Sequence, residues 1–474
     1  MCFAQDDEKE GKLQSTKPPY TSSTVRPAPL IFLSAGEASG DHYGAELIAA
    51  LKPVLPHARY TGLGGTAMEA VGQRRVVRAE DVAVMGITEI LRHIPRILTS
   101  YRRLVRSIRA QRPDVAVLID FPDVNFRLAK HLKRMGVPVL WFVSPQLWAW
   151  KRRRLRWVQQ RVSKMLCIFP FEQPFYAARG VQAEFVGHPL AGQPLPTISR
   201  EAYAEAARNT LQEQWHFALD VLHEQPFSSW KARRDGDGLR YALDPAKEWI
   251  ALLPGSRPGE IKANLWEMLG GAMALGSTYE FLIPVAPTIG DDLLKSIQAS
   301  VGETLETPKP VPRITFVRDA RAALLHSRAA VVASGTATVQ AAVIGTPFVT
   351  VYKVSKLTFA AAKRLVRYPA EIKAEVDRHG NLPIAMVNLI AGRRVVPELL
   401  QEQFTAENVA AHLHLLLEVK PEREAQLARL AEVRMRLQSM GDKSPIERVR
   451  DAVLDALEQP SVPYPEESGL RLTS

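Results

Sequence analysis

Two carboxylates follow an uninterrupted apolar segment in LIDFPDVN, residues 118–125. Pro122 lies between Asp120 and Asp123 and fixes the turn there. Either carboxylate could serve as a general base, because burial or the charge of its neighbour would raise its pKa towards the working pH. Alternatively, Asp123 or Asn125 could simply cap the helix that follows. The residues of this segment leave both interpretations open.

Two other segments place glycine and hydroxyl residues between a predicted strand and a predicted helix. They are LLPGSRPGEI (residues 252–261) and ASGTATVQAAVIGTPFV (residues 333–349). The turn residues are Gly255, Ser256 and Arg257 in the first, and Ser334, Gly335 and Thr336 in the second. Glycine admits close backbone approach, and hydroxyls, amides and a guanidinium at a helix start favour phosphate binding. Two such turns in one region predict a diphosphate ligand.

A basic segment rich in tryptophan spans residues 143–157, VSPQLWAWKRRRLRW. Aromatic rings beside cations can stack on nucleic-acid bases, lie at a lipid headgroup interface or bind a phosphorylated amphiphile. The alternative is a solvated face of an amphipathic helix, since apolar residues recur at helical spacing beneath the arginines. Trp148, Lys151 and Arg152 are the candidate contact residues of this segment.

The turn SAGEASGDHYG, residues 34–44, also lies between a predicted strand and a predicted helix. Gly36 and Gly40 allow a tight turn, while Ser39 and Asp41 are residue types that cap helices. The G-x-G-x-x-G spacing of a dinucleotide site is absent. The segment therefore predicts a glycine-lined turn at the ligand-binding edge of a sheet.

The sequence predicts no metal and no cofactor. DGDG, residues 235–238, has the Asp-x-Asp spacing of some metal sites, but it follows no apolar strand and indicates a surface turn. No other cluster of His, Cys and carboxylate residues has the spacing of metal ligands.

These motifs are separated by short apolar runs that alternate with helical stretches. The predicted strands are residues 30–34, 115–119, 138–143, 165–169, 183–186, 249–253, 280–285, 313–317, 330–333 and 347–352. Strands that are apolar throughout are typical of parallel sheets covered on both faces. The pattern predicts an α/β protein with two Rossmann-like lobes. The uncharged window 329–352 is long enough to span a membrane, but its glycines and proline favour a buried βαβ unit.

Shifts in composition divide the chain. The predicted segments are a tail (1–28), a first Rossmann-like lobe (29–194), a polar linker or insertion (195–247), a second Rossmann-like lobe (248–415), C-terminal helices (416–458) and a tail (459–474). In the C-terminal helices, Ile446, Val449, Val453, Leu454 and Leu457 form an apolar stripe. This stripe must pack on a lobe of the chain or on a partner.

The composition is that of an ordinary globular protein, with 46% hydrophobic and 23% charged residues among 474. It excludes fibrous, disordered and disulfide-rich classes. The formal net charge of +11 calls for an anionic partner. Cys2 and Cys167 offer no disulfide framework, and the first residues lack a secretory signal, so we expect a cytoplasmic protein.

Nine blocks of the sequence resemble the lipid-A-disaccharide synthase family in order and register. The blocks are SAGEASGDHYG, VMGITEIL, IDFPDVNFRLAKHLK, VSPQLWAWK, FPFE, GHPL, LLPGSR, SGTAT and NLIAGRRVVPELLQ. The resemblance covers roughly residues 29–415, apart from the insertion. The resemblance implies a two-lobed GT-B fold whose parallel sheets face a central cleft.

The resemblance also implies an inverting glycosyltransferase that joins UDP-2,3-diacylglucosamine to 2,3-diacylglucosamine 1-phosphate and releases UDP. Asp123 is then the expected base, with Asp120 as its rival. The expected UDP-sugar contacts are Gly255, Ser256, Arg257, Ser334, Gly335, Thr336 and Gln340. The expected acceptor contacts are Ser39, Trp148, Lys151, Arg152 and His188. Peripheral contact with the cytoplasmic face of the inner membrane follows from the acylated substrates. Residues 85–98 could form that contact or a packed core helix, and a homodimer is left open.

The sequence departs from the expected pattern at Gln340, where GT-B enzymes commonly have a glutamate that binds ribose. The stretches 191–251 and 367–388 also look longer than usual for the family. Three alternatives are weighed against the synthase: another GT-B enzyme (an epimerase or a lipid-linked transferase), a nucleic-acid binder, and a catalytically silent protein at the membrane surface. The blocks at 119–133 and 143–151 count against the other GT-B enzymes, and no nucleic-acid partner is expected.

Overall fold

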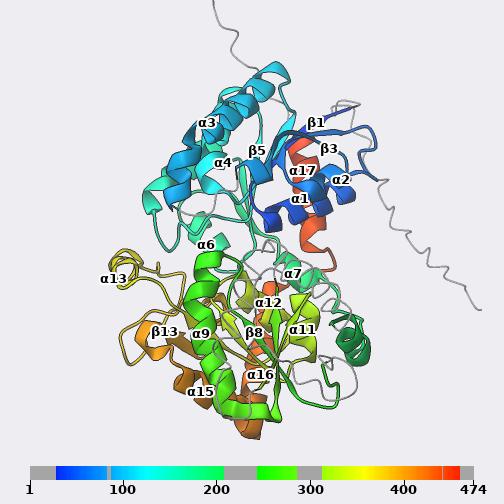
Figure 1. The fold of residues 1–474 in the computed structure, drawn as a ribbon. Helices are drawn as coiled ribbons and strands as arrows, with labels where there is room; N and C mark the ends of the chain where they lie inside the picture. Colours follow the sequence, from blue (N-terminus) through cyan, green and yellow to red (C-terminus); the bar gives the residue numbers. More distant parts are fainter. Residues whose placement is uncertain (1–27, 83–86, 208–242, 286–311, 440, 459–474) are drawn as a thin grey trace, which may run out of the picture.

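The computed structural model describes residues 28–82, 87–207, 243–285, 312–439 and 441–458, and within these ranges it does not describe the side chains of residues 87–96 and 258. Two lobes lie one above the other in Figure 1, each built on a parallel sheet with helices on its faces. The prediction of an α/β protein with two Rossmann-like lobes is confirmed.

The first lobe holds a seven-stranded sheet with the order β3-β2-β1-β4-β5-β6-β7. Its strands are β1 (Leu30–Ala35), β2 (Arg59–Gly64), β3 (Gln73–Arg78), β4 (Val115–Ile119), β5 (Val139–Phe142), β6 (Lys164–Cys167) and β7 (Ala183–Phe185). Its helices are α1 (Ala38–Leu51), α2 (Thr66–Ala70), α3 (Ile87–Ala110), α4 (Pro122–Arg134), α5 (Leu155–Arg161), α6 (Glu172–Ala177) and α7 (Pro189–Gly192). Strands β1, β4 and β5 are buried along their whole length, as expected for central parallel strands.

The second lobe holds a six-stranded sheet with the order β10-β9-β8-β11-β12-β13. Its strands are β8 (Trp249–Leu253), β9 (Glu280–Pro284), β10 (Arg313–Val317), β11 (Ala329–Ala333), β12 (Phe348–Tyr352) and β13 (Glu398–Leu400). The described helices that follow β8 are α9 (Pro258–Leu275), α11 (Ala320–His326), α12 (Thr336–Ile344), α13 (Lys356–Leu365), α14 (Met386–Ala391), α15 (Ala406–Glu418), α16 (Lys420–Leu437) and α17 (Pro445–Glu458).

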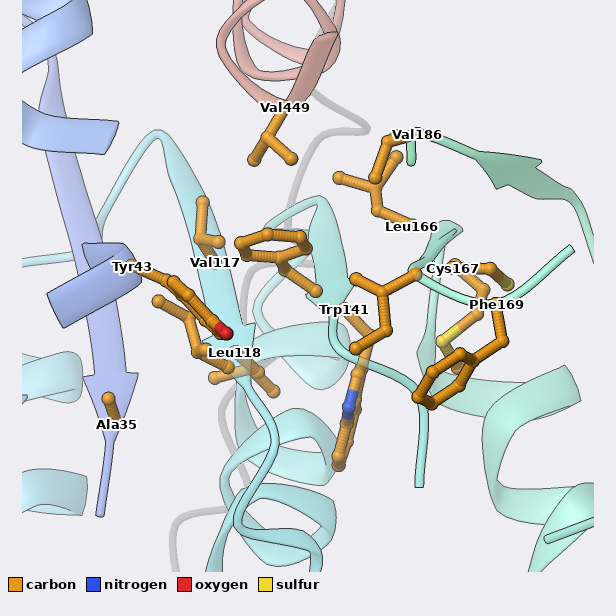
Figure 2. Packing of buried hydrophobic residues seen from close by; sticks show 14 of the residues in the cluster. Ala35, Tyr43, Val117, Leu118, Trp141, Leu166, Cys167, Phe169, Val186 and Val449 are labelled. Atoms are coloured by element: carbon orange, nitrogen blue, oxygen red, sulfur yellow. The ribbon is translucent and has the colours of Figure 1, made fainter. Parts of the chain in front are cut away.

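The last helix returns to the first lobe. In Figure 1, α16 lies in the lower lobe, whereas α17 lies in the upper lobe beside α1. Helix α17 also contacts β4 and β5, and Val449 and Val453 are fully buried. Figure 2 shows Val449 pointing towards core residues of the first sheet, among them Val117. The apolar stripe predicted from the sequence therefore packs on a lobe of the same chain.

The uncharged window at residues 329–352 forms β11, α12 and β12, in agreement with the predicted βαβ unit. Within the described residues, no helix is both long and apolar enough to cross a lipid bilayer. The segment is uncharged because β11 is buried throughout and α12 is mostly buried.

Candidate active site

The first wall of the site consists of the turns that follow β1 and β4. These strands are parallel neighbours, with Ala35 opposite Ile119, so their carboxyl ends meet at one edge of the sheet. After β4 the backbone takes left-handed angles at Asp120 and Phe121, with φ of 44° and 48°. Helix α4 then begins at Pro122, which needs no amide partner at a helix start.

The side chain of Asn125 fixes the turn after β4 through hydrogen bonds. Its buried side-chain amide donates to the carbonyl of Asp120 at 2.8 Å and to those of Ser34 and Ile119 at 3.3 Å. The hydroxyl of Ser34 donates to Asn125 Oδ1 at 2.7 Å. The N-cap residue of α4 is Phe121, which forms no side-chain cap bond, so neither Asp123 nor Asn125 is the N-cap of this helix. Asn125 instead fixes the ends of β1 and β4 relative to each other.

The two turns also touch directly. A Cβ atom placed on Gly36 would lie 2.5 Å from the ring of Phe121, well inside van der Waals contact. Glycine is therefore required at position 36 by the approach of the second turn.

Asp120 is half-buried where these turns meet. Burial raises the pKa of its carboxyl to about 6, and the negative charge of Glu37 acts in the same direction. A hydrogen bond from the amide of Phe121 and the positive charge of Arg257 oppose this shift of the pKa. Such a carboxyl is largely ionised at neutral pH and still basic enough to accept a proton.

The second wall belongs to the other lobe. Gly255 follows β8 with a φ of +126°, a region that favours glycine, and the next two residues are exposed. Glu260 accepts a hydrogen bond from the amide of Ser256 at 3.2 Å and lies 3.5 Å from the Arg257 guanidinium. Arg257 Nη2 lies 4.0 Å from Glu37 Oε1, so the turn after β8 meets the turn after β1 across the gap between the lobes.

The turn after β11 lies beside the turn after β8, because these two strands are parallel neighbours. Gly335 and Thr336 are exposed there, while Ser334 and Gln340 are half-buried. The hydroxyl of Thr338 donates to the carbonyl of Gly335 at 2.8 Å and fixes the start of α12. The two predicted anion-binding turns thus share one edge of the second sheet.

Asp123 has different surroundings from Asp120. Its side chain is 72% exposed and forms an ion pair with Arg154 at 2.7 Å. It lines a cavity of about 340 Å³ that also contains five basic side chains, which we call the α4 cavity. The basic residues are Arg127, Lys130, Arg134, Arg154 and Arg161.

The predicted acceptor residues divide into exposed and buried positions. Ser39 and Lys151 are exposed, and the exposed Arg152 donates to the carbonyl of Arg367 in the second lobe. Trp148 and His188 are only 1% and 2% exposed. Contact of these two side chains with an acceptor stays a prediction, and burial leaves them little surface for it in this structure.

Trp148 belongs to a buried polar group that the sequence did not reveal. Its indole N–H donates to Glu172 Oε1 at 3.1 Å, and the amide of Phe169 donates to the same carboxyl at 3.2 Å. Burial raises the pKa of Glu172 to about 8. This group supports the loop that carries the basic segment.

The long stretch at residues 367–388 contacts the first lobe. Arg179 pairs with Glu371 at 2.8 Å, and the ring of Trp148 lies 5.8 Å from that of Tyr368. The DGDG motif at residues 235–238 lies outside the described residues. In the described ranges, no group of three His, Cys, Asp or Glu side chains could hold a metal ion.

Comparison with known sequences settles the family. Residues 31–217 and 230–447 match the family model described as lipid-A-disaccharide synthetase. The lipid-A-disaccharide synthase of Acidobacterium capsulatum is 48% identical over 91% of this chain and 97% of its own length. That of Koribacter versatilis is 44% identical over 90% and 99%. The chain belongs to the lipid-A-disaccharide synthase family.

Solved structures support the fold. The anthocyanidin 3-O-glucosyltransferase in complex with UDP has a TM-score of 0.52 at 12% identity and covers 90% of this chain and 98% of its own. The calicheamicin glycosyltransferase CalG4 has a TM-score of 0.51 at 14% identity, with 92% and 100% covered. The GT-B prediction is confirmed, as is the prediction of a glycosyltransferase. Family membership excludes the epimerase and the nucleic-acid binder as the main function.

Proposed function

We propose that the protein transfers the diacylglucosamine unit of UDP-2,3-diacylglucosamine to the 6-hydroxyl of 2,3-diacylglucosamine 1-phosphate. The hydroxyl oxygen attacks the anomeric carbon and its proton passes to a carboxylate. The bond from that carbon to the diphosphate breaks, and UDP leaves with the electron pair. The observation that carries the proposal is the approach of Glu37 and Arg257 across the lobes, beside Asp120.

Asp120 is the carboxylate that suits the base better. Burial raises its pKa, and its turn is fixed by Asn125. Asp123 is largely exposed and forms an ion pair with Arg154. The sequence alone ranked Asp123 first, and the surroundings of the two groups favour the reverse order.

The second wall suits the leaving diphosphate. Arg257 presents positive charge at the end of β8, and Gly255 admits close approach of a ligand to the backbone there. The neighbouring turn at residues 334–336 adds hydroxyl groups, and Gln340 lies in the helix that follows. Glutamine can hydrogen-bond a ribose diol without carrying charge.

The acylated substrates place the protein at a membrane surface in this proposal. Helix α3 lies on the outer side of the first lobe in Figure 1. Its last turns expose Arg102, Arg103, Arg106 and Arg109, and Leu98 is 39% exposed. Exposed cations attract anionic headgroups, and apolar side chains insert beside them. The predicted contact at residues 85–98 lies largely outside the described side chains.

Purified protein incubated with both acylated sugars tests the reaction. We expect the tetra-acylated disaccharide 1-phosphate and UDP in equal amounts by mass spectrometry. A matched incubation with the acceptor lacking its 6-hydroxyl should release no disaccharide. UDP release without disaccharide in the complete mixture would show hydrolysis instead of transfer. Light scattering on the active sample distinguishes a monomer from a homodimer.

A further inference from the structure

The α4 cavity is a second concentration of charge, and all of its lining residues belong to the first lobe. It is lined from α3, α4 and α5, by Tyr101, Asp123 and Trp157 among others. Its volume of about 340 Å³ falls at the small end of ligand sites, which is enough for a head group but not for a diacylated sugar.

Positive charge exceeds negative charge inside this cavity. Asp123 is the acidic residue among its lining residues, and Arg154 pairs with it. Among the described residues, no carboxylate forms an ion pair with Arg127, Lys130 or Arg134. Like charges within a Debye length of about 8 Å repel one another, so an anion in the cavity would remove an unfavourable interaction.

The charged residues that α4 contributes to the cavity lie on one face of the helix. Asp123, Arg127, Lys130 and Arg134 are spaced by three or four residues, which brings them onto adjacent turns. Since α4 is anchored through Asn125 and buries Phe126 and Leu132, this face is held in place. The charges are therefore presented by a rigid element.

The opposite wall is also fixed. The Arg161 guanidinium donates to the carbonyl of Phe126 at 3.0 Å and lies 4.9 Å from the ring of Trp157. Trp157 packs edge-on against Phe126 with ring centroids 5.5 Å apart. His131 Nε2 and the hydroxyl of Tyr101 lie 3.1 Å apart, so one of these groups donates to the other and one proton of the pair remains for a ligand. These contacts fix the positions of the side chains in this wall without a ligand.

We propose that the α4 cavity binds a phosphate group carried by a lipid. Guanidinium and ammonium groups in a fixed arrangement are the groups that recognise phosphate oxygens. The phosphate comes either from a membrane phospholipid headgroup or from the 1-phosphate of the acceptor. The second source rests on the proposed function, whereas the first does not.

The test compares the double variant Lys130→Gln/Arg134→Gln with Lys133→Gln. Lys133 is exposed on the same helix and does not line the cavity, so its variant removes positive charge from the same surface. Circular dichroism checks that all variants fold. Binding is measured by co-sedimentation with phosphatidylcholine vesicles with and without phosphatidylglycerol. The KM for 2,3-diacylglucosamine 1-phosphate is measured in detergent, without vesicles.

We expect the double variant to weaken one of these interactions about tenfold, and Lys133→Gln to change it less than about twofold. Loss of binding to phosphatidylglycerol vesicles assigns the site to a phospholipid headgroup. A raised KM with unchanged vesicle binding assigns it to the acceptor. The vesicle measurement needs no transferase activity, so its failure is separable from failure of the proposed function. Equal effects of both variants, or no effect of either, would overturn the proposal.

Discussion

The two walls of the site are built differently. In the first lobe, the buried Asn125 joins the ends of β1 and β4, and Gly36 packs against Phe121. In the second lobe, Arg257, Gly335 and Thr336 are exposed. Folding therefore fixes the carboxyl group before substrate arrives, whereas the groups that would meet UDP remain accessible. A base needs an exact position, and a diphosphate is recognised chiefly by charge.

The largest effect is expected at the fixed wall. Asp120→Asn removes the proposed base with little change in volume, and kcat should fall by about 10²- to 10⁴-fold. The dissociation constant of UDP, measured by calorimetry, should remain within about threefold of the wild-type value. A kcat close to that of the wild type would remove Asp120 from the mechanism.

Asp123→Asn serves as the matched variant, because it neutralises a carboxyl in the same turn. Its kcat should fall less than about tenfold, since the side chain is exposed and paired.

The wild-type kcat/KM should also fall on acidification through about pH 6, where the Asp120 carboxyl takes up a proton. A kcat/KM that stays constant through about pH 6 would remove Asp120 as the base.

Asn125→Ala tests whether the first wall depends on one side chain. The change leaves three backbone carbonyls, two of them buried, without their amide donor, so the free energy of unfolding should fall by about 3 kcal/mol in urea titrations. Ser34→Ala removes a single hydrogen bond in the same place and should cost about 1 kcal/mol. Equal losses for both variants would contradict the central role of Asn125.

Much of the fold was predictable, because central parallel strands are apolar throughout. All ten predicted strands are present, within two residues of their expected ends. The strands that the sequence did not reveal have physical reasons to be inconspicuous. Strand β2 contains two glycines, the edge strand β3 contains three arginines, and β13 has three residues. Edge and short strands lack the apolar pattern that identifies central ones.

The site was predictable only within each turn. The glycine and hydroxyl residues of LLPGSR and SGTAT lie at the strand ends that the sequence indicated. Which of Asp120 and Asp123 suits the role of base depends on burial and on Arg154. Arg154 lies 31 positions beyond Asp123 in the sequence. Glu37 meets Arg257 across the two lobes, and spacing within one motif carries no information about such a contact. The available signal for Glu37 was its position in the turn after the first predicted strand, at the edge of the sheet where ligands bind.

Arg257→Gln tests the open wall. Loss of the guanidinium should weaken UDP binding about tenfold, the effect of one hydrogen bond to a charged group. Lys262→Gln provides the control, since Lys262 is exposed on α9 a short distance along the same helix. The unfolding free energy of both variants should match that of the wild type, because neither side chain is buried. A large loss of stability in Arg257→Gln would show that this wall is fixed by folding as well.

The smallest effect concerns Glu172, in the buried polar group that supports the basic segment. Burial raises the pKa of Glu172 from 4.5 to about 8, so the folded protein binds a proton here that the unfolded chain has released between these pH values. Stability must then fall as pH rises across this window, by at most about 1.4 kcal/mol per pH unit. Glu172→Gln cannot lose a proton, so its unfolding free energy should fall less steeply than that of the wild type between pH 6.5 and pH 8. Parallel curves for the two proteins would mean that Glu172 is already ionised in the fold.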